Sequence, residues 1–151
     1  MRRMAVNHLY IDAQPEEVFS YLADGRTYAE WVVGAKRIRA VDSGWPAPGT
    51  RIHHTVGGGP FTLDDHTEVL EVEPNRRLVL DARARPFGRA RVELHLEPTA
   101  GGTEVVMREL PVSLPGVAQG LLEPLLHLRN GKALRRLRDG VRRRAQRVTQ
   151  G

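Results

Sequence analysis

The chain has 151 residues, enough for one domain with its own core, so we expect residues 1–151 to fold as a single domain. It contains no cysteine, which excludes disulfides and thiolate-bound metals, and no apolar run near the roughly 18 residues of a membrane-spanning helix. The net charge of +5 is concentrated between Arg129 and Arg147, a segment that contains nine basic residues and one acidic residue. The amino-terminal MRRMAVNHLYIDA has no apolar segment long enough for a signal sequence, so we expect a cytoplasmic protein.

The first elements in the chain are a strand and two short helices. Residues 4–11 alternate loosely between apolar and polar side chains, as a strand does. Pro15 suits the first turn of a helix, because the N–H that proline lacks has no partner there. Apolar side chains follow at helical spacing until Asp24–Gly25, which ends the helix, and Tyr28–Val32 forms a further turn.

Six short segments follow, separated by turn sequences rich in glycine and proline. In Arg91–Glu97 the apolar and polar side chains alternate strictly, which predicts an antiparallel sheet with one face toward solvent. GGGP at Gly57–Pro60 lies between two strands and not between a strand and a helix, so it is interpreted as a hairpin turn. The predicted strands are Ala35–Val41, Arg51–Val56, Thr67–Glu73, Arg77–Ala84, Ala90–Glu97 and Glu104–Leu110.

The tail changes to helical periodicity. From Gly116 onward apolar residues recur at intervals of three and four, which predicts one long helix with an apolar stripe; Pro124 either begins its regular part or kinks it. A curved antiparallel sheet has one apolar face to cover, and this helix is the only element long enough to cover it. We therefore expect an α+β fold in which the short helices close one end of the curve and the first strand crosses to the far edge of the sheet.

Four segments carry a resemblance to a known family: IDAQPEEVFSYLAD followed by Trp31, VLEVEPNRRLVL, GGTEVVMRE and RNGKALRRLRDGV. In this order, over nearly the whole chain, they resemble the START-like (SRPBCC) superfamily and its bacterial polyketide cyclase/dehydrase and lipid-transport members. The resemblance implies a helix-grip fold, with a seven-stranded curved antiparallel sheet wrapped around a long carboxy-terminal helix, and two short helices between strands 1 and 2. It also implies a deep apolar cavity with Trp31 near its rim or end cap, and Gly49 in the loop before the second hairpin strand.

The sequence contains no nucleophile elbow, Walker loop, HExxH zinc site or Rossmann fingerprint. His53 and His54 are neighbours on a strand, so their rings point to opposite faces and cannot hold one metal together. Asp64–His66 offers two carboxylates and an imidazole, but at an expected loop-to-strand junction, where a solvated turn is favoured. The resemblance brings no metal, and we expect neither a metal nor a cofactor.

Five polar side chains share the parity or the stripe of apolar neighbours, and we expect them to point into the cavity. On the strands, His54 follows positions 52 and 56, Glu109 follows 105 and 107, and His66 follows 70 and 72, although Val69 makes the last parity ambiguous. On the helix the stripe becomes polar toward its amino-terminal end. An unpaired polar group in a filled core costs about 1–3 kcal/mol, which a cavity with water or ligand avoids. With Trp31, the predicted ligand-binding residues are His54, His66, Glu109, His127 and Asn130.

Three functions remain open on the sequence. The first, which we favour, is binding of a hydrophobic or amphipathic small molecule, a lipid or polyketide-like compound, in the cavity. The second is a cyclase/dehydratase-type enzyme without metal, in which His54, Glu109 or His127 moves protons and apolar walls raise the pKa of a Glu. The third is a protein-interaction module with a filled core. Fold alone does not choose between them.

The arginine-rich part of the helix has three interpretations of its own. A solvated outer face is favoured. Weak contact with an anionic membrane surface would suit a lipid carrier. Nucleic-acid binding is the least favoured, because the basic positions alternate with the core stripe and no aromatic residue is interleaved for base stacking.

Overall fold

The computed structural model describes residues 4–83, 88–112 and 116–150. The chain begins with one strand and three short helical segments, continues through six strands and ends in a helix of 35 residues. The elements are β1 (Ala5–Ile11), α1 (Pro15–Ala23), η1 (Gly25–Thr27), α2 (Tyr28–Trp31), β2 (Ala35–Val41), β3 (Arg51–Gly58), β4 (Phe61–Glu73), β5 (Arg77–Arg83), β6 (Arg89–Thr99), β7 (Gly102–Pro111) and α3 (Gly116–Gln150).

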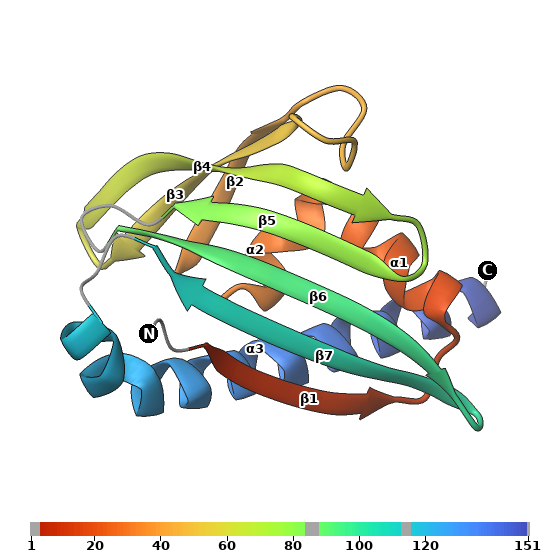
Figure 1. Cartoon of the computed structure of the whole chain (residues 1–151). Coiled ribbons are helices and arrows are strands. Elements are labelled where there is room, and N and C mark those ends of the chain that lie inside the picture. Colours follow the sequence, from red (N-terminus) through yellow and green to blue (C-terminus); the bar gives the residue numbers. More distant parts are fainter. Residues whose placement is uncertain (1–3, 84–87, 113–115, 151) are drawn as a thin grey trace.

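The seven strands form one antiparallel sheet in the order β1-β7-β6-β5-β4-β3-β2 (Figure 1). Strand β1 pairs with the last strand and β2 lies at the opposite edge, so the three helical segments carry the chain from one edge to the other. The short helices after β1 are therefore the connection that lets the first and last strands lie side by side at one edge of the sheet. The predicted helix-grip fold is confirmed.

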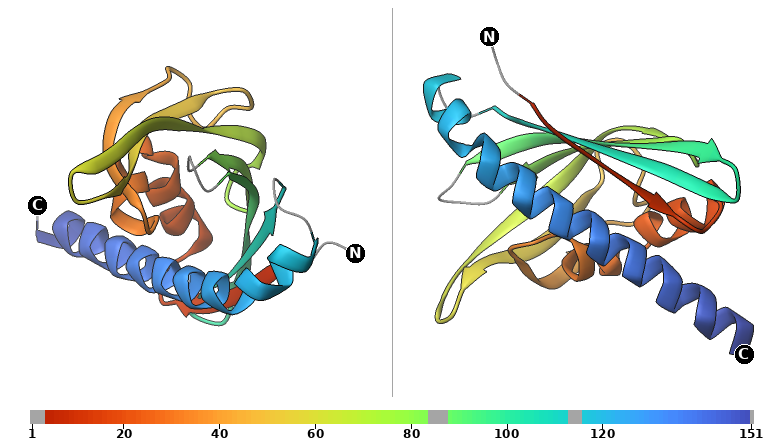
Figure 2. Two further views of the ribbon diagram at one scale, coloured as in Figure 1. Left: turned by 90° about the vertical axis from the view of Figure 1, so that its left-hand side faces the viewer. Right: turned by 90° about the horizontal axis from the view of Figure 1, so that it is seen from below.

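Helix α3 crosses the concave side of the curved sheet, as the two views in Figure 2 show. Its carboxy-terminal half packs tightly on α1, and Leu134, Leu137 and Val141 are buried in the same cluster as Val18 of α1. Gly140 allows this close approach, because a Cβ there would overlap the ring and hydroxyl of Tyr21. This end of the concavity is filled with side chains.

Three arginines of α3 also pair with acids near the short helices. Arg142 Nε lies 2.9 Å from Asp12 Oδ1, and Arg144 Nη2 lies 2.8 Å from Asp24 Oδ2. Arg143 lies 3.7 Å from Glu30. Part of the basic helix thus serves to tie α3 to the elements beside it. None of the helices among the described residues is both long and apolar enough to span a membrane.

The bounds of β2 to β7 agree with the predicted ones to within two residues, except at the start of β4. This strand begins at Phe61, six residues before the predicted Thr67, so Asp64–His66 lies inside a strand and not at its junction with a loop. Two adjacent acids are unfavourable for strand propensity, but the backbone ladder to β3 continues through them to the pair Gly58–Phe61. The predicted hairpin turn at GGGP is present, but it consists of residues 59–60 alone, because Gly57 and Gly58 still pair with β4. Ala84, the predicted last residue of β5, lies outside the described residues.

Candidate functional site

A cavity of about 630 Å³ lies at the end of the concavity away from α1. Its walls come from α2, the inner faces of β3, β5, β6 and β7, and the part of α3 between residues 125 and 133. Most of the lining is apolar, and includes Trp31, Val56, Leu80, Val92, Met107 and Ala133. The sheet and helix thus diverge where the tight packing around Leu137 ends, and leave space for a guest molecule.

Four of the six predicted ligand-binding residues line this cavity: Trp31, His54, Glu109 and Asn130. Their exposed fractions are between 1% and 4%, so they are part of the interior and not of the rim. Trp31 packs edge-on against Tyr28, with 5.8 Å between ring centroids, and closes the end formed by α2. The other two predicted residues, His66 and His127, lie outside the cavity.

The prediction for His66 is wrong because strand β4 contains a bulge. Asp65, Thr67 and Val69 are the buried residues of the strand, and His66 alternates away from them. The register shifts between Val69 and Glu71, so the parity read from positions 70 and 72 does not extend back across this irregularity. The His66 ring instead lies beside that of His53 on the outer face, with 6.4 Å between centroids.

The prediction that His127 points into the cavity is wrong. It came from extending the apolar stripe of the helix toward the amino terminus in alternating steps of three and four residues. Those steps average 3.5 residues, while an α-helix has 3.6 per turn, so the face drifts along a long helix. His127 is exposed beside β1, where Nδ2 of Asn7 donates to its backbone carbonyl at 2.9 Å. The cavity-facing positions are the neighbouring Leu126 and Arg129.

A buried chain of hydrogen bonds supports the wall around His54. The His54 Nε2 atom lies 3.0 Å from Thr67 Oγ1, which lies 2.8 Å from the Tyr28 hydroxyl. The His54 and Tyr28 rings stack, with centroids 5.3 Å apart. Burial lowers the pKa of His54 to about 4, and raises the pKa of Tyr28 to about 12. Both side chains are therefore neutral near pH 7.

Glu109 is paired with an arginine that the sequence interpretation had assigned to the outer face. Nη2 of Arg129 donates to both carboxylate oxygens of Glu109, to Oε1 at 2.6 Å. The Glu109 side chain is 5% exposed and that of Arg129 is 41% exposed, so the pair connects the cavity to its mouth. The sequence indicated Arg129 only indirectly. A carboxylate predicted to be buried, such as that of Glu109, needs a cation beside it, and the helix that faces it is rich in arginine.

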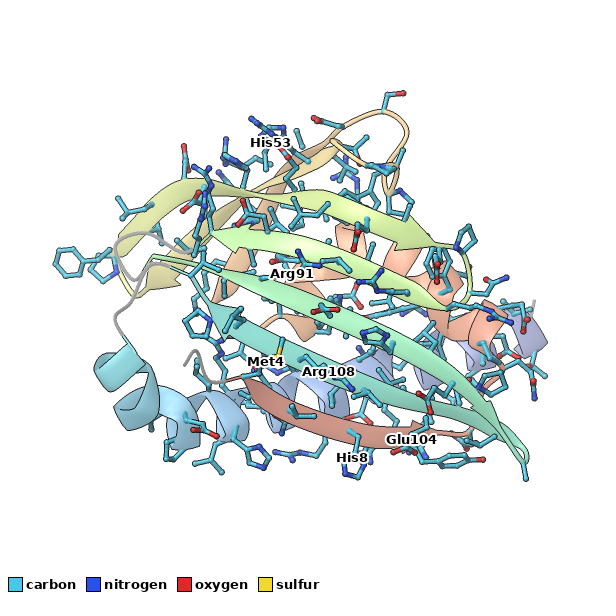
Figure 3. The ribbon with its side chains drawn as sticks, viewed as in Figure 1. Met4, His8, His53, Arg91, Glu104 and Arg108 are labelled. Atoms are coloured by element: carbon cyan, nitrogen blue, oxygen red, sulfur yellow. The ribbon has the colours of Figure 1, made fainter. Side chains whose placement is uncertain are left out.

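The outer face of the sheet is charged and internally paired. Figure 3 shows His8, Glu104, Arg108, Arg91 and His53 on the face turned away from α3. His8 Nδ1 lies 2.9 Å from Glu104 Oε1, and Arg91 lies 3.4 Å from Glu71. Among the described residues, no three His, Asp or Glu side chains are grouped closely enough to hold a metal ion. This face therefore contributes no groups to the cavity.

Comparison with known families matches residues 6–145 to the family described as polyketide cyclase / dehydrase and lipid transport. The chain belongs to this family. Among proteins with curated descriptions, none has a sequence that matches it.

Solved structures with the same fold include targets of structural genomics and proteins described as aromatase/cyclases. Protein NE0264 from Nitrosomonas europaea aligns with a TM-score of 0.76 and 17% identity, over 95% of this chain and 96% of that one. The Zhui aromatase/cyclase from Streptomyces sp. R1128 aligns with a TM-score of 0.74 and 15% identity, over 96% of both chains. The di-domain ARO/CYC StfQ of the steffimycin pathway aligns with a TM-score of 0.71 and 12% identity, over 95% of this chain and 51% of that one. Identities this low show a common fold alone.

The buried ion pair predicts a specific pattern of stability. Replacing Arg129 by Met keeps most of the apolar stem but leaves the Glu109 carboxylate buried without its cation. We expect the free energy of unfolding to fall by about 2 kcal/mol, below the full effect of breaking a buried pair because Arg129 is partly exposed. Urea unfolding measures this. The control is Arg142→Met, which breaks an exposed pair and should lower the free energy of unfolding much less. Adding Glu109→Gln to the Arg129→Met protein should restore its stability. Equal losses of stability in Arg129→Met and Arg142→Met would contradict a buried ion pair between Arg129 and Glu109.

The lowered pKa of His54 predicts how stability depends on pH. In the unfolded chain His54 has a pKa near 6.5, whereas in the folded protein its pKa is about 4. Between these two pH values the unfolded state therefore binds a proton at His54 and the folded state does not. The free energy of unfolding should therefore fall as pH drops from about 6.5 toward 4, by about 3 kcal/mol from this residue, with no contribution above pH 6.5. Urea unfolding at pH 7 and pH 4.5 tests this against His54→Phe, which can stack on Tyr28 but cannot titrate. An equal loss in both proteins would show that His54 is not the cause.

Proposed function

We propose that the protein binds a hydrophobic or amphipathic small molecule, of the lipid or polyketide class, in the cavity between the sheet and α3. The observation that carries this proposal is the mainly apolar cavity of about 630 Å³, a size typical of small-molecule sites. Apolar surface buried there by a guest contributes roughly 25 cal/mol per Å². The proposed ligand-binding residues are Trp31, His54, Glu109 and Asn130, with Arg129 added from the geometry.

The comparisons support this proposal at the level of family. The family's description joins cyclases and dehydrases to lipid transport, and the described cavity suits a guest of either kind. The interaction module considered from the sequence requires a filled core, which does not agree with the space beside Trp31 and Met107.

A cyclase/dehydratase-type enzyme is the second candidate. The hydrogen bonds that connect Tyr28, Thr67 and His54 favour an enzyme, because they orient the His54 imidazole at the wall of the cavity. Two features favour binding instead. A His with a pKa of about 4 is a weak base near neutral pH, and the Glu109 carboxylate is already engaged by Arg129. We therefore place binding first.

Filling the cavity tests the proposal directly. Ala133 lines the cavity from α3 and is 3% exposed, so Ala133→Phe places a ring in the space that a ligand would occupy. We expect the dissociation constant of the neutral fluorescent probe N-phenyl-1-naphthylamine to rise at least about 10-fold, since its apolar surface loses the site. Fluorescence titration measures this.

The control for this variant is Ala145→Phe, near the carboxy-terminal end of the same helix and outside the cavity lining. It should bind the probe as the unaltered protein does, and thermal unfolding should show that both variants remain folded. Unchanged probe binding in a folded Ala133→Phe protein would contradict binding in this cavity.

A further inference from the structure

Large apolar side chains protrude into solvent at the end of the molecule where the cavity opens. Phe61 and Leu63 of β4 are 83% and 47% exposed, and Leu125 and Leu128 of α3 are 62% and 69% exposed. The β3–β4 hairpin and the start of α3 lie at the same end of the molecule in Figure 1 and in the right view of Figure 2. We call these four residues the apolar rim. Contiguous exposed apolar surface of this kind marks a contact site.

The strand register shows that the hairpin part of the apolar rim belongs to the concave face. Leu63 is directly opposite Val56 of β3, and Phe61 is opposite Gly58. Directly opposed residues of an antiparallel pair point to the same face of the sheet. Because Val56 lines the cavity, Leu63 and Phe61 continue its apolar wall outward, to a part of the sheet that no helix covers. Leu125 lines the cavity from the other side.

Basic side chains follow the apolar rim along α3. Leu125, Leu128, Lys132 and Arg135 are spaced by three, four and three residues, so they share one face of the helix, and all four are exposed. Neither Lys132 nor Arg135 has an acidic partner among the described residues. This face of α3 therefore joins exposed apolar groups to unpaired positive charge.

The strands at this end of the molecule add to the positive charge. Strand β2 leaves the cavity wall after residue 35, and the next two residues, Lys36 and Arg37, are exposed and have no acidic partner among the described residues. The acid of the hairpin, Asp64, lies 3.4 Å from Arg39 Nε. Glu123 of α3 has an interaction partner as well. The described acids thus leave an excess of positive charge around the apolar rim.

An anionic lipid surface fits this arrangement better than a protein partner does. Exposed Phe and Leu side chains bury themselves at the boundary between headgroups and acyl chains, and Lys and Arg beside them are attracted to anionic headgroups. A bilayer is fluid, so apolar groups on both sides of an open cavity reach it together without a partner of matching shape. In this orientation the cavity opens toward the lipid in which a hydrophobic guest dissolves.

From the apolar rim and the unpaired cations beside it, we propose that the protein docks on anionic membrane surfaces with the open end of its cavity toward the lipid. The apolar rim enters the interface, and the cations of α3 and β2 approach the headgroups. This contact goes beyond the proposed binding function and does not require an occupied cavity.

Vesicles of defined composition test the docking. Phosphatidylcholine vesicles with about 30% phosphatidylglycerol are compared with vesicles of phosphatidylcholine alone, by co-sedimentation at low and at high NaCl concentration. At low salt the protein should bind the anionic vesicles at least about 10-fold more tightly than the neutral ones. This preference should disappear at about 1 M salt, where charges are screened within about 3 Å.

A single fluorescent label tests which part of the protein enters the lipid. The chain has no cysteine, so Phe61→Cys provides one thiol for the environment-sensitive dye NBD at the apolar rim. Val148→Cys is the matched control, because Val148 is 77% exposed near the opposite end of α3. On anionic vesicles the emission from position 61 should shift to shorter wavelength and rise at least about 2-fold, since lipid replaces water around the dye, while that from position 148 stays as in solution.

Two double variants with the same change in net charge separate the local cations from the overall charge. Lys132→Gln/Arg135→Gln removes two unpaired cations beside the apolar rim, and should weaken binding to anionic vesicles at least about 10-fold. Arg142→Gln/Arg144→Gln removes two cations that already pair with acids, and should weaken it less than about 3-fold. Thermal unfolding shows whether each variant is folded.

Several results would overturn docking through the apolar rim. They are equal binding to both kinds of vesicle, no binding to either, an unchanged emission at position 61, or equal losses in the two folded charge variants. Dimers of the unaltered protein in sedimentation velocity that Leu128→Ser abolishes, without vesicle binding, would assign the apolar rim to a second copy of the chain instead. All of these leave the proposed binding function standing, because the titration with N-phenyl-1-naphthylamine tests it without lipid.

Discussion

The structure depends on how far one helix can cover a curved sheet. Helix α3 contacts the concave side closely at its carboxy-terminal half, where Gly140 lets it approach α1 and Leu137 is fully buried. The sheet curves away from the opposite half, and the side chains there do not fill the gap. The cavity is thus a consequence of one helix packing closely on a curved sheet over only part of its length, with α2 and Trp31 closing the end between them.

An open cavity changes which polar residues the interior can hold. In a filled core His54, Asn130 and Glu109 would each destabilise the fold, because burial removes water from their polar atoms. Here the protein satisfies them unequally. Glu109 has its cation and Nε2 of His54 has Thr67, while Nδ1 of His54 and Nδ2 of Asn130 have no hydrogen-bond partner among the described residues.

Much of the fold, and some of the polar residues that line the cavity, could be predicted from the sequence. Strict period-two alternation placed His54 and Glu109 correctly, because β3 and β7 have no bulge near these residues. His66 was misplaced since a bulge resets parity and has no clear sequence signal in β4. His127 was misplaced because a small error in helical period accumulates over four turns. Arg129 was missed because the sequence does not show which arginine of the helix pairs with Glu109.

The central claim, that a guest occupies the space between α3 and the sheet, is tested most directly by intermolecular NOEs. With methyl-labelled protein and N-phenyl-1-naphthylamine, we expect NOEs from the probe to the methyl groups of Met107 and Ala133, which both line the cavity. NOEs to Leu70 of the outer side alone, or to no methyl group at probe saturation, would contradict it.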